Sequence, residues 1–68
     1  MKFFICGCNG MAGHTISLYL REQGYEVFGF DLKESTLIPS IACNAFNTET
    51  LRKVIAEGNY DTVINCIG

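Results

Sequence analysis

The 68-residue sequence lacks the marks of several large classes of protein. Tryptophan is absent, proline occurs once, and charged residues make up only 18% of the chain. Seven acidic residues against five Lys and Arg give a net charge of −2, so no basic surface for nucleic acid is expected. The longest apolar runs have only a few residues, too few for a helix that crosses a membrane. At 49% hydrophobic residues the chain is too apolar for a disordered tail, and its length allows one small domain.

Metal-binding patterns are missing as well. The chain has one histidine and no C-x-x-C motif, so no metal site is expected. Most of its cysteines lie in or beside apolar runs, where Cys acts as a small hydrophobe. We therefore expect reduced thiols and a cytoplasmic location, with Cys6 in the core and Cys8 as the thiol that could be exposed and oxidised. Disulfides remain the alternative, because an even number of cysteines in a short chain is also typical of secreted domains. The four are Cys6, Cys8, Cys43 and Cys66.

Apolar runs and helical periodicity alternate along the chain. The runs predict strands over residues 2–6, 25–31, 38–43 and 61–67. Helical spacing predicts helices over 11–23 and from Asn47 or Thr48 to the stop at Glu57–Asn59. The order β-α-β-β-α-β with continuously apolar strands is typical of a parallel α/β sheet. With right-handed crossovers and the strand order 3-2-1-4, the helices would lie on both faces of that sheet.

The same pattern indicates which side chains face inward. In the first helix, one apolar side is expected, which Ala12, Ile16, Tyr19 and Leu20 widen and along which lie Met11, Thr15 and Leu18. Lys2 is expected to be solvated surface. Asn65, polar within an apolar strand, should hydrogen-bond the glycine turn or the backbone on the cofactor side. Four strands with one helix on each face leave much surface bare, so we expect part of a larger domain or a chain that borrows cover from another copy. The aromatics expected in the core are Phe3, Phe4, Phe28 and Phe30.

The segment between the first strand and the first helix is a G-x-x-G-x-x-G motif. Glycine suits the sharp turn after a strand at Gly7. The absent side chain at Gly10 would let the main chain approach a pyrophosphate, and at Gly13 it would let the helix pack close to the sheet. Free N–H groups at the start of the helix favour an anion there. No Gly-Lys-Ser/Thr follows, so the motif is not a P-loop; an ordinary tight turn is the alternative.

Asp31 ends the second predicted strand, 18 residues after Gly13. In a dinucleotide-binding fold, an acid at this point accepts hydrogen bonds from the adenosine ribose hydroxyls. Its carboxylate would repel a 2′-phosphate, which favours NAD, whereas Lys33 could offset that repulsion and admit NADP. The turn and Asp31 together predict a site for NAD(P)H in a partial Rossmann-type sheet.

These residues resemble a known family, the extended short-chain dehydrogenase/reductases. The resemblance rests on the glycine motif, on Gly13-His14-Thr15-Ile16, on Gly29-Phe30-Asp31, and on residues 61–68, Asp-Thr-Val-Ile-Asn-Cys-Ile-Gly. The last segment is similar to that of the dTDP-4-dehydrorhamnose reductases, a group of sugar-nucleotide reductases. The likeness spans the whole chain but only the cofactor-binding start of the family, so it implies that residues 1–68 are the N-terminal part of an NAD(P)-binding Rossmann domain.

The resemblance also implies further cofactor contacts. Asn9, Met11 and Ala12 would contact the pyrophosphate, mostly through the backbone. Leu32 and the Asn44-Ala45 pair would lie beside the adenine, with Asn44 in the place of the family's acid. The stretch Cys66–Gly68 would pass near the ribose and nicotinamide.

The family's catalytic Tyr-x-x-x-Lys pair does not occur in the sequence, because Tyr19, Tyr25 and Tyr60 are followed four residues later by Gln, Gly and Ile. No catalytic residue is therefore expected here, and the pair and the sugar-binding part should lie beyond residue 68. The resemblance implies a parent enzyme that reduces the 4-keto group of dTDP-4-dehydro-rhamnose, with a nucleotide sugar as partner and a homo-oligomer possible. A nucleotide-sugar epimerase or dehydratase, a non-enzymatic NAD(P)-sensing regulator, and a structural half that binds nothing are the alternatives.

Overall fold

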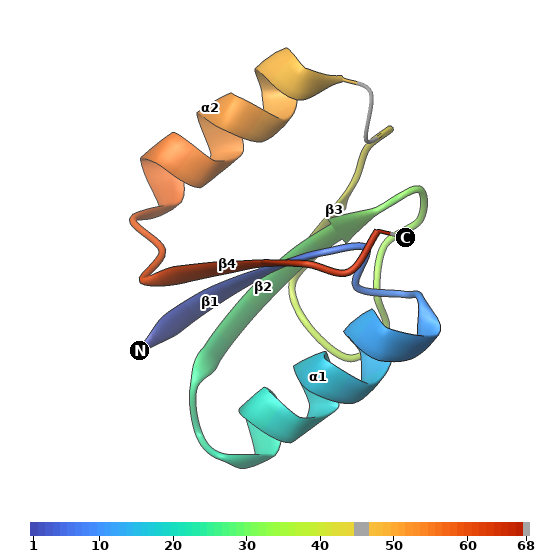
Figure 1. Cartoon of the computed structure of the whole chain (residues 1–68), viewed down its shortest axis with the longest axis vertical. Coiled ribbons are helices and arrows are strands. Elements are labelled where there is room, and N and C mark those ends of the chain that lie inside the picture. Colours follow the sequence, from blue (N-terminus) through green and yellow to red (C-terminus); the bar gives the residue numbers. More distant parts are fainter. Residues whose placement is uncertain (45–46, 68) are drawn as a thin grey trace.

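A computed structural model of the chain describes residues 1–44 and 47–67. Strands and helices follow the predicted order β-α-β-β-α-β (Figure 1). The two middle strands and the last one are shorter than the apolar runs that contain them. The elements are β1 (Lys2–Cys6), α1 (Met11–Glu22), β2 (Glu26–Asp31), β3 (Ser40–Ala42), α2 (Thr48–Gly58) and β4 (Thr62–Asn65).

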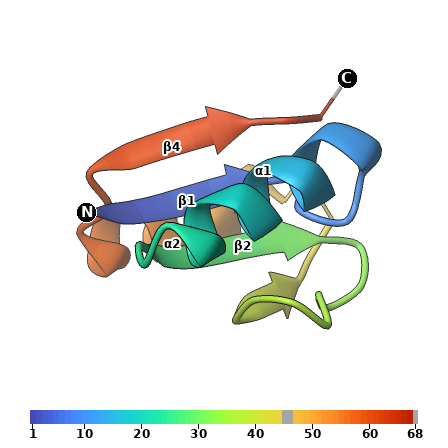
Figure 2. The ribbon, with the colours of Figure 1, turned by 90° about the horizontal axis from the view of Figure 1, so that it is seen from below.

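The four strands form one parallel sheet in the order β3-β2-β1-β4, as predicted (Figure 2). β1 lies in the interior of the sheet, with Ile5 opposite Gly29 of β2 and Ile64 of β4. Helices α1 and α2 cover opposite faces (Figure 1), so residues of β1 are buried on both sides. The Rossmann-type α/β fold expected from the sequence is confirmed.

Helix α1 packs tightly on its face of the sheet. Its buried residues are Gly13, Ser17 and Leu20, beside a core that includes Phe3, Ile5, Cys8, Val27 and Ile38. The expected apolar side is confirmed only in part: Leu20 is buried and Ile16 packs against this core, whereas Met11 is 91% exposed and Leu18 37%. The close approach at Gly13 fixes the rotation of the helix, and it turns the Met11 side outward although that side is apolar.

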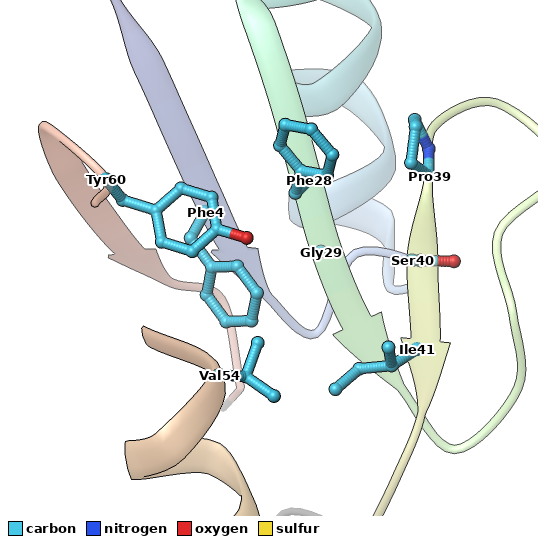
Figure 3. Close-up of a pocket in the computed structure, with 8 residues that line it drawn as sticks. All are labelled: Phe4, Phe28, Gly29, Pro39, Ser40, Ile41, Val54 and Tyr60. Atoms are coloured by element: carbon cyan, nitrogen blue, oxygen red, sulfur yellow. The ribbon is translucent and has the colours of Figure 1, made fainter. Parts of the chain in front are cut away.

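Helix α2 covers the other face more loosely. Of the two predicted caps, Asn47 and Thr48, Asn47 is the one used, because its Oδ1 accepts a hydrogen bond from the Thr50 N–H at 3.3 Å. No described residue of α2 is buried. Its half-buried Leu51, Val54 and Ile55 pack against Phe4, Cys6 and Phe30. Figure 3 shows Val54 and Ile41 facing a cavity of about 180 Å³, closed on another side by the rings of Phe4, Phe28 and Tyr60.

Lys2 connects β1 to the end of α2 and is not the solvated residue that the sequence suggested. Its Nζ donates a hydrogen bond to the Gly58 carbonyl oxygen at 2.5 Å. The same ammonium lies 5.1 Å from the ring centroid of Tyr60 and 5.3 Å from that of Phe28. The carboxyl end of a helix carries partial negative charge, and aromatic faces attract cations. Both kinds of contact therefore stabilise the Lys2 ammonium in this half-buried position.

All four cysteines are free, as expected, but Cys8 is buried instead of exposed. Gly29 makes room for it, because a Cβ on Gly29 would stand 2.7 Å from the Cβ of Cys8. Burial raises the pKa of the Cys8 thiol, and the Asp31 carboxylate raises it further. The expectation of an oxidisable Cys8 was therefore wrong.

Two features are absent from the described residues. None of the helices there is long and apolar enough to span a membrane. In residues 1–44 and 47–67, no three His, Cys, Asp or Glu side chains gather as metal ligands would.

Candidate functional site

The glycine turn is held in place by main-chain hydrogen bonds. The N–H groups of Gly7 and Cys8 both donate to the Phe30 carbonyl oxygen, at 2.9 and 3.1 Å. The Gly10 N–H donates to the Gly7 carbonyl oxygen at 3.1 Å. The turn is thus fastened to the end of β2 as well as to β1, and it brings Asp31 alongside the start of α1.

The three glycines of the motif differ in what the fold demands of them. Gly7 has φ +79°, a conformation that side chains disfavour. A Cβ on Gly13 would stand 2.1 Å from the Gly7 carbonyl oxygen, so no side chain fits there. A Cβ on Gly10 would meet only that same oxygen at 3.5 Å, an ordinary contact. The fold itself therefore requires glycine at positions 7 and 13 but not at the exposed position 10.

The start of α1 presents unpaired donors. Gly10 is the N-cap and has no side chain to accept from the first turn, which also lacks an acidic residue. Among the residues that the structure describes, the main-chain N–H groups of Met11, Ala12 and Gly13 have no acceptor. Unpaired N–H groups and the helix dipole together favour an anion at this end.

Asp31 stands at the carboxyl end of β2 with both carboxylate oxygens engaged. Its Oδ2 accepts from the Asn9 N–H at 2.9 Å and its Oδ1 from the Leu32 N–H at 2.7 Å. The Asn9 side chain also reaches across, where Nδ2 donates to the Lys33 carbonyl oxygen at 2.7 Å. Each carboxylate oxygen keeps a lone pair for a further donor.

A pocket of about 200 Å³ opens beside this carboxylate. Five predicted cofactor residues line it together, although they come from four separate segments of the chain. Sequence reasoning missed the other two, because Phe30 was assigned to the core and Cys43 was treated as a small hydrophobe. Their places near the ends of predicted strands were the available signal. The lining is Gly7, Phe30, Asp31, Leu32, Cys43, Asn44 and Ile67.

The remaining predicted residues lie around the pocket or outside it. Asn9, Gly10, Met11 and Ala12 are exposed on the glycine turn and the first turn of α1, and Lys33 is exposed after β2. Cys66 is half-buried and packs on the α1 side of the sheet. The Asn65 Oδ1 accepts from the Ile67 N–H at 3.0 Å, so it holds the backbone of this edge as expected. Ala45 and Gly68 fall outside the described residues.

Comparison with known proteins places this arrangement in a family. Residues 3–68 match the NAD-dependent epimerase/dehydratase family. A curated relative, the probable low-salt glycan biosynthesis reductase Agl14 of Haloferax volcanii, is 35% identical over an alignment of 68 positions that covers 97% of this chain and 23% of that protein.

Solved structures show the same fold. The enzyme WbmH of Bordetella bronchiseptica, crystallised in complex with NAD⁺, superposes with a TM-score of 0.83 at 24% identity over 98% of this chain and 25% of its own. A structure from Burkholderia cenocepacia has the same TM-score and coverage at 19% identity. The chain thus spans about a quarter of the length of these relatives. On the match over residues 3–68, the chain belongs to the NAD-dependent epimerase/dehydratase family.

Proposed function

We propose that residues 1–68 are the N-terminal, cofactor-binding part of an NAD(P)-dependent enzyme that acts on a nucleotide sugar. One observation carries the proposal: unpaired N–H groups at the start of α1 and the Asp31 carboxylate lie at the same edge of the sheet, joined by the glycine turn. That edge offers donors for a diphosphate and acceptors for a ribose, the two polar parts of the adenosine half of a dinucleotide.

Each predicted residue then has a task in holding the cofactor. The N–H groups at Met11 and Ala12 bind the pyrophosphate, which comes close because Gly7, Gly10 and Gly13 have no side chains. Asp31 accepts from the ribose hydroxyls, and Lys33 bears on the choice between NAD and NADP. The adenine lies against Leu32 and the Asn44-Ala45 pair, and Cys66 and Ile67 pass toward the nicotinamide side. Asn9, whose N–H already bonds Asp31, contributes to the turn beside the pyrophosphate.

When bound, the cofactor supplies a hydride to the carbonyl carbon of the substrate. These 68 residues hold its adenosine end, and a proton donor such as a Tyr-x-x-x-Lys pair would come from elsewhere in a longer protein. We favour reduction of the 4-keto group of dTDP-4-dehydro-rhamnose, on the resemblance of residues 61–68 and the likeness to a glycan biosynthesis reductase. Epimerisation or dehydration of a nucleotide sugar is the second candidate, favoured by the family match.

Gly10 offers a direct test, because the fold has room for a side chain there. We expect Gly10→Ala to lower the free energy of unfolding by no more than about 1 kcal/mol, because alanine is a poorer N-cap than glycine. It should weaken NADH binding at least about tenfold, since the methyl group would occupy the space of the phosphates. Isothermal titration calorimetry of the purified chain measures the binding.

Gly24→Ala is the matched control. Gly24 has φ +86° with open space around it, so alanine there costs about 1 kcal/mol of stability but leaves the site untouched. If Gly10→Ala binds NADH as well as the unmodified chain, or if the unmodified chain binds neither NADH nor NADPH, the proposed function is wrong.

A further inference from the structure

Asn9 ties together two segments that are 22–25 residues apart in the sequence. Its main-chain N–H holds the Asp31 carboxylate at 2.9 Å, and its side-chain Nδ2 holds the Lys33 carbonyl oxygen at 2.7 Å. The Glu34 carbonyl oxygen lies 3.5 Å from the same Nδ2. Asn9, a residue of the glycine turn, therefore holds the start of the loop after β2 by hydrogen bonds to Asp31 and to Lys33.

These hydrogen bonds fix the position of Leu32, a residue that lines the pocket. Leu32 lies between the two anchored residues, Asp31 and Lys33, and lines the pocket although it is 70% exposed. A side chain so exposed has little packing of its own to hold it. The position of its backbone depends on the hydrogen bonds on either side, of which the Asn9 amide supplies the one at Lys33.

The hydrogen bonds of Asn9 also limit how far the Asp31 carboxylate can move away from a bound cofactor. Both Asp31 oxygens already accept a main-chain N–H, at 2.9 and 2.7 Å. A 2′-phosphate would bring negative charge against this carboxylate, and like charges at short range repel each other. Relief would require the loop after β2 to move away from the turn, and the Asn9 side chain opposes that movement.

We propose that the side-chain amide of Asn9 is a positioning residue that makes the site select NADH over NADPH, by fastening the Asp31–Lys33 segment to the glycine turn. The inference rests on the proposed function and adds its cofactor specificity. Asn9 acts through Asp31 and Leu32, and its side chain needs no contact with the cofactor. Discrimination comes from rigidity: the carboxylate that receives the ribose hydroxyls is held where a 2′-phosphate would have to sit.

The test is the ratio of the dissociation constants for NADPH and NADH, measured by titration of the chain. The unmodified chain should favour NADH by at least about tenfold, and Asn9→Ala should lower that ratio by about three- to tenfold, the worth of one hydrogen bond. Asn9→Ser keeps a small polar turn residue whose hydroxyl ends short of the Lys33 carbonyl, so it should lower the ratio to the same extent. It also serves if the alanine variant does not fold.

Asn59→Ala is the control for lost stability, because Asn59 has φ +52° and lies after α2, away from the pocket. It should lower stability and leave the ratio unchanged. If the unmodified chain binds both cofactors equally, or if the Asn9 variants keep its ratio, the inference is wrong while the proposed function stands. If the chain binds neither cofactor, the proposed function fails and the inference fails with it.

Discussion

The two helices pack against opposite faces of the same strands, yet they do so in different ways. Helix α1 buries Gly13, Ser17 and Leu20, whereas no described residue of α2 is buried. At Gly13 no side chain separates the helix from the strand-to-helix turn, so backbone lies against backbone. Helix α2 contacts the sheet through half-buried side chains and leaves a cavity of about 180 Å³ over β2 and β3 (Figure 3). The difference shows that a missing Cβ, more than apolar area, decides how closely a helix approaches.

The closely packed layer is also the one that carries the candidate site. The start of α1 is placed by the contact of Gly13 with Gly7, and Gly7 lines the pocket beside Asp31. A shift of α1 would therefore move the unpaired N–H groups relative to the carboxylate. Within residues 1–44 and 47–67 no equivalent constraint acts on α2, whose start is fixed by the Asn47 cap and by half-buried side chains.

The largest expected effect on the free energy of unfolding comes from adding a methyl group at a glycine of one helix or of the other. Gly13→Ala should destabilise the chain by about 3 kcal/mol or more, because the Cβ would stand 2.1 Å from a main-chain oxygen that cannot move aside. Gly58→Ala would bring its Cβ 2.2 Å from the Tyr60 ring, but a ring can rotate away and alanine adds helix propensity. We expect a change of about 1 kcal/mol there. Urea unfolding followed by circular dichroism compares the two, and equal losses would contradict the difference between the layers.

The next effect concerns the leucines that each helix directs at the sheet. Leu20 is 8% exposed in α1, and Leu51 is half-buried in α2. Leu20→Ala should cost about 3 kcal/mol, and Leu51→Ala about 1 kcal/mol, because the looser layer loses less buried area and leaves a smaller new cavity. The same unfolding measurement applies. A larger loss at Leu51 would show that α2 is the better packed helix.

A smaller effect of opposite sign is expected within α1. The Ser17 hydroxyl is buried, at 1% residue exposure, and has no hydrogen-bond partner among the described residues. Ser17→Ala removes that unsatisfied group and should stabilise the chain by about 1 kcal/mol. The exposed Thr50→Ala in α2 is the control, since it reports the change in helix propensity alone. A loss of stability in Ser17→Ala would mean that the hydroxyl fills space that the packing of α1 needs.

The fold could be predicted from the sequence because its signals are local. Continuous apolar runs mark the strands, and the glycine motif and the Asn47 cap mark the helix starts. The inner side of α1 could be predicted only in part, because apolar residues occupy much of the circumference of that helix and no spacing marks the close contact at Gly13. Periodicity also says nothing of Cys8, which is buried only because Gly29 on a neighbouring strand leaves space.

Prediction of the site succeeded and failed for similar reasons. Asp31 and Leu32 share the pocket with Asn44 and Ile67 because parallel strands end at one edge, which follows from topology. The bonds of Asn9 to Asp31 and Lys33 depend on the exact path of two loops. The same holds for Lys2, whose partner is the Gly58 carbonyl at the far end of the chain. Contacts of this kind are not marked by any spacing in the sequence.

The smallest expected effect is a loss of folding stability at alkaline pH, which is absent at neutral pH. It concerns one thiol on each face of the sheet, Cys8 on the side of α1 and Cys6 on the side of α2. Burial raises the pKa of Cys8 in the α1 layer and of Cys6 in the α2 layer above the ordinary value of 9.0. The secondary causes are Asp31 for Cys8 and Cys66 for Cys6. In the unfolded chain both thiols ionise near 9.0, whereas in the folded chain they ionise only at higher pH. The stability that this difference supplies is complete below pH 9 and is lost as pH rises through the folded pKa values.

Urea unfolding from pH 7 to pH 10.5 under reducing conditions measures the loss. Cys8→Ala and Cys6→Ala should each flatten the decline above pH 9, apart from any constant loss of packing that appears at every pH. Tyr60, whose pKa burial raises above 10.0, contributes at the upper end in all variants alike. The flattening should begin near pH 9 in both variants, because the ionisation of the thiols in the unfolded chain sets where the decline starts. A decline that both variants retain in full would show that neither thiol is held neutral by its layer.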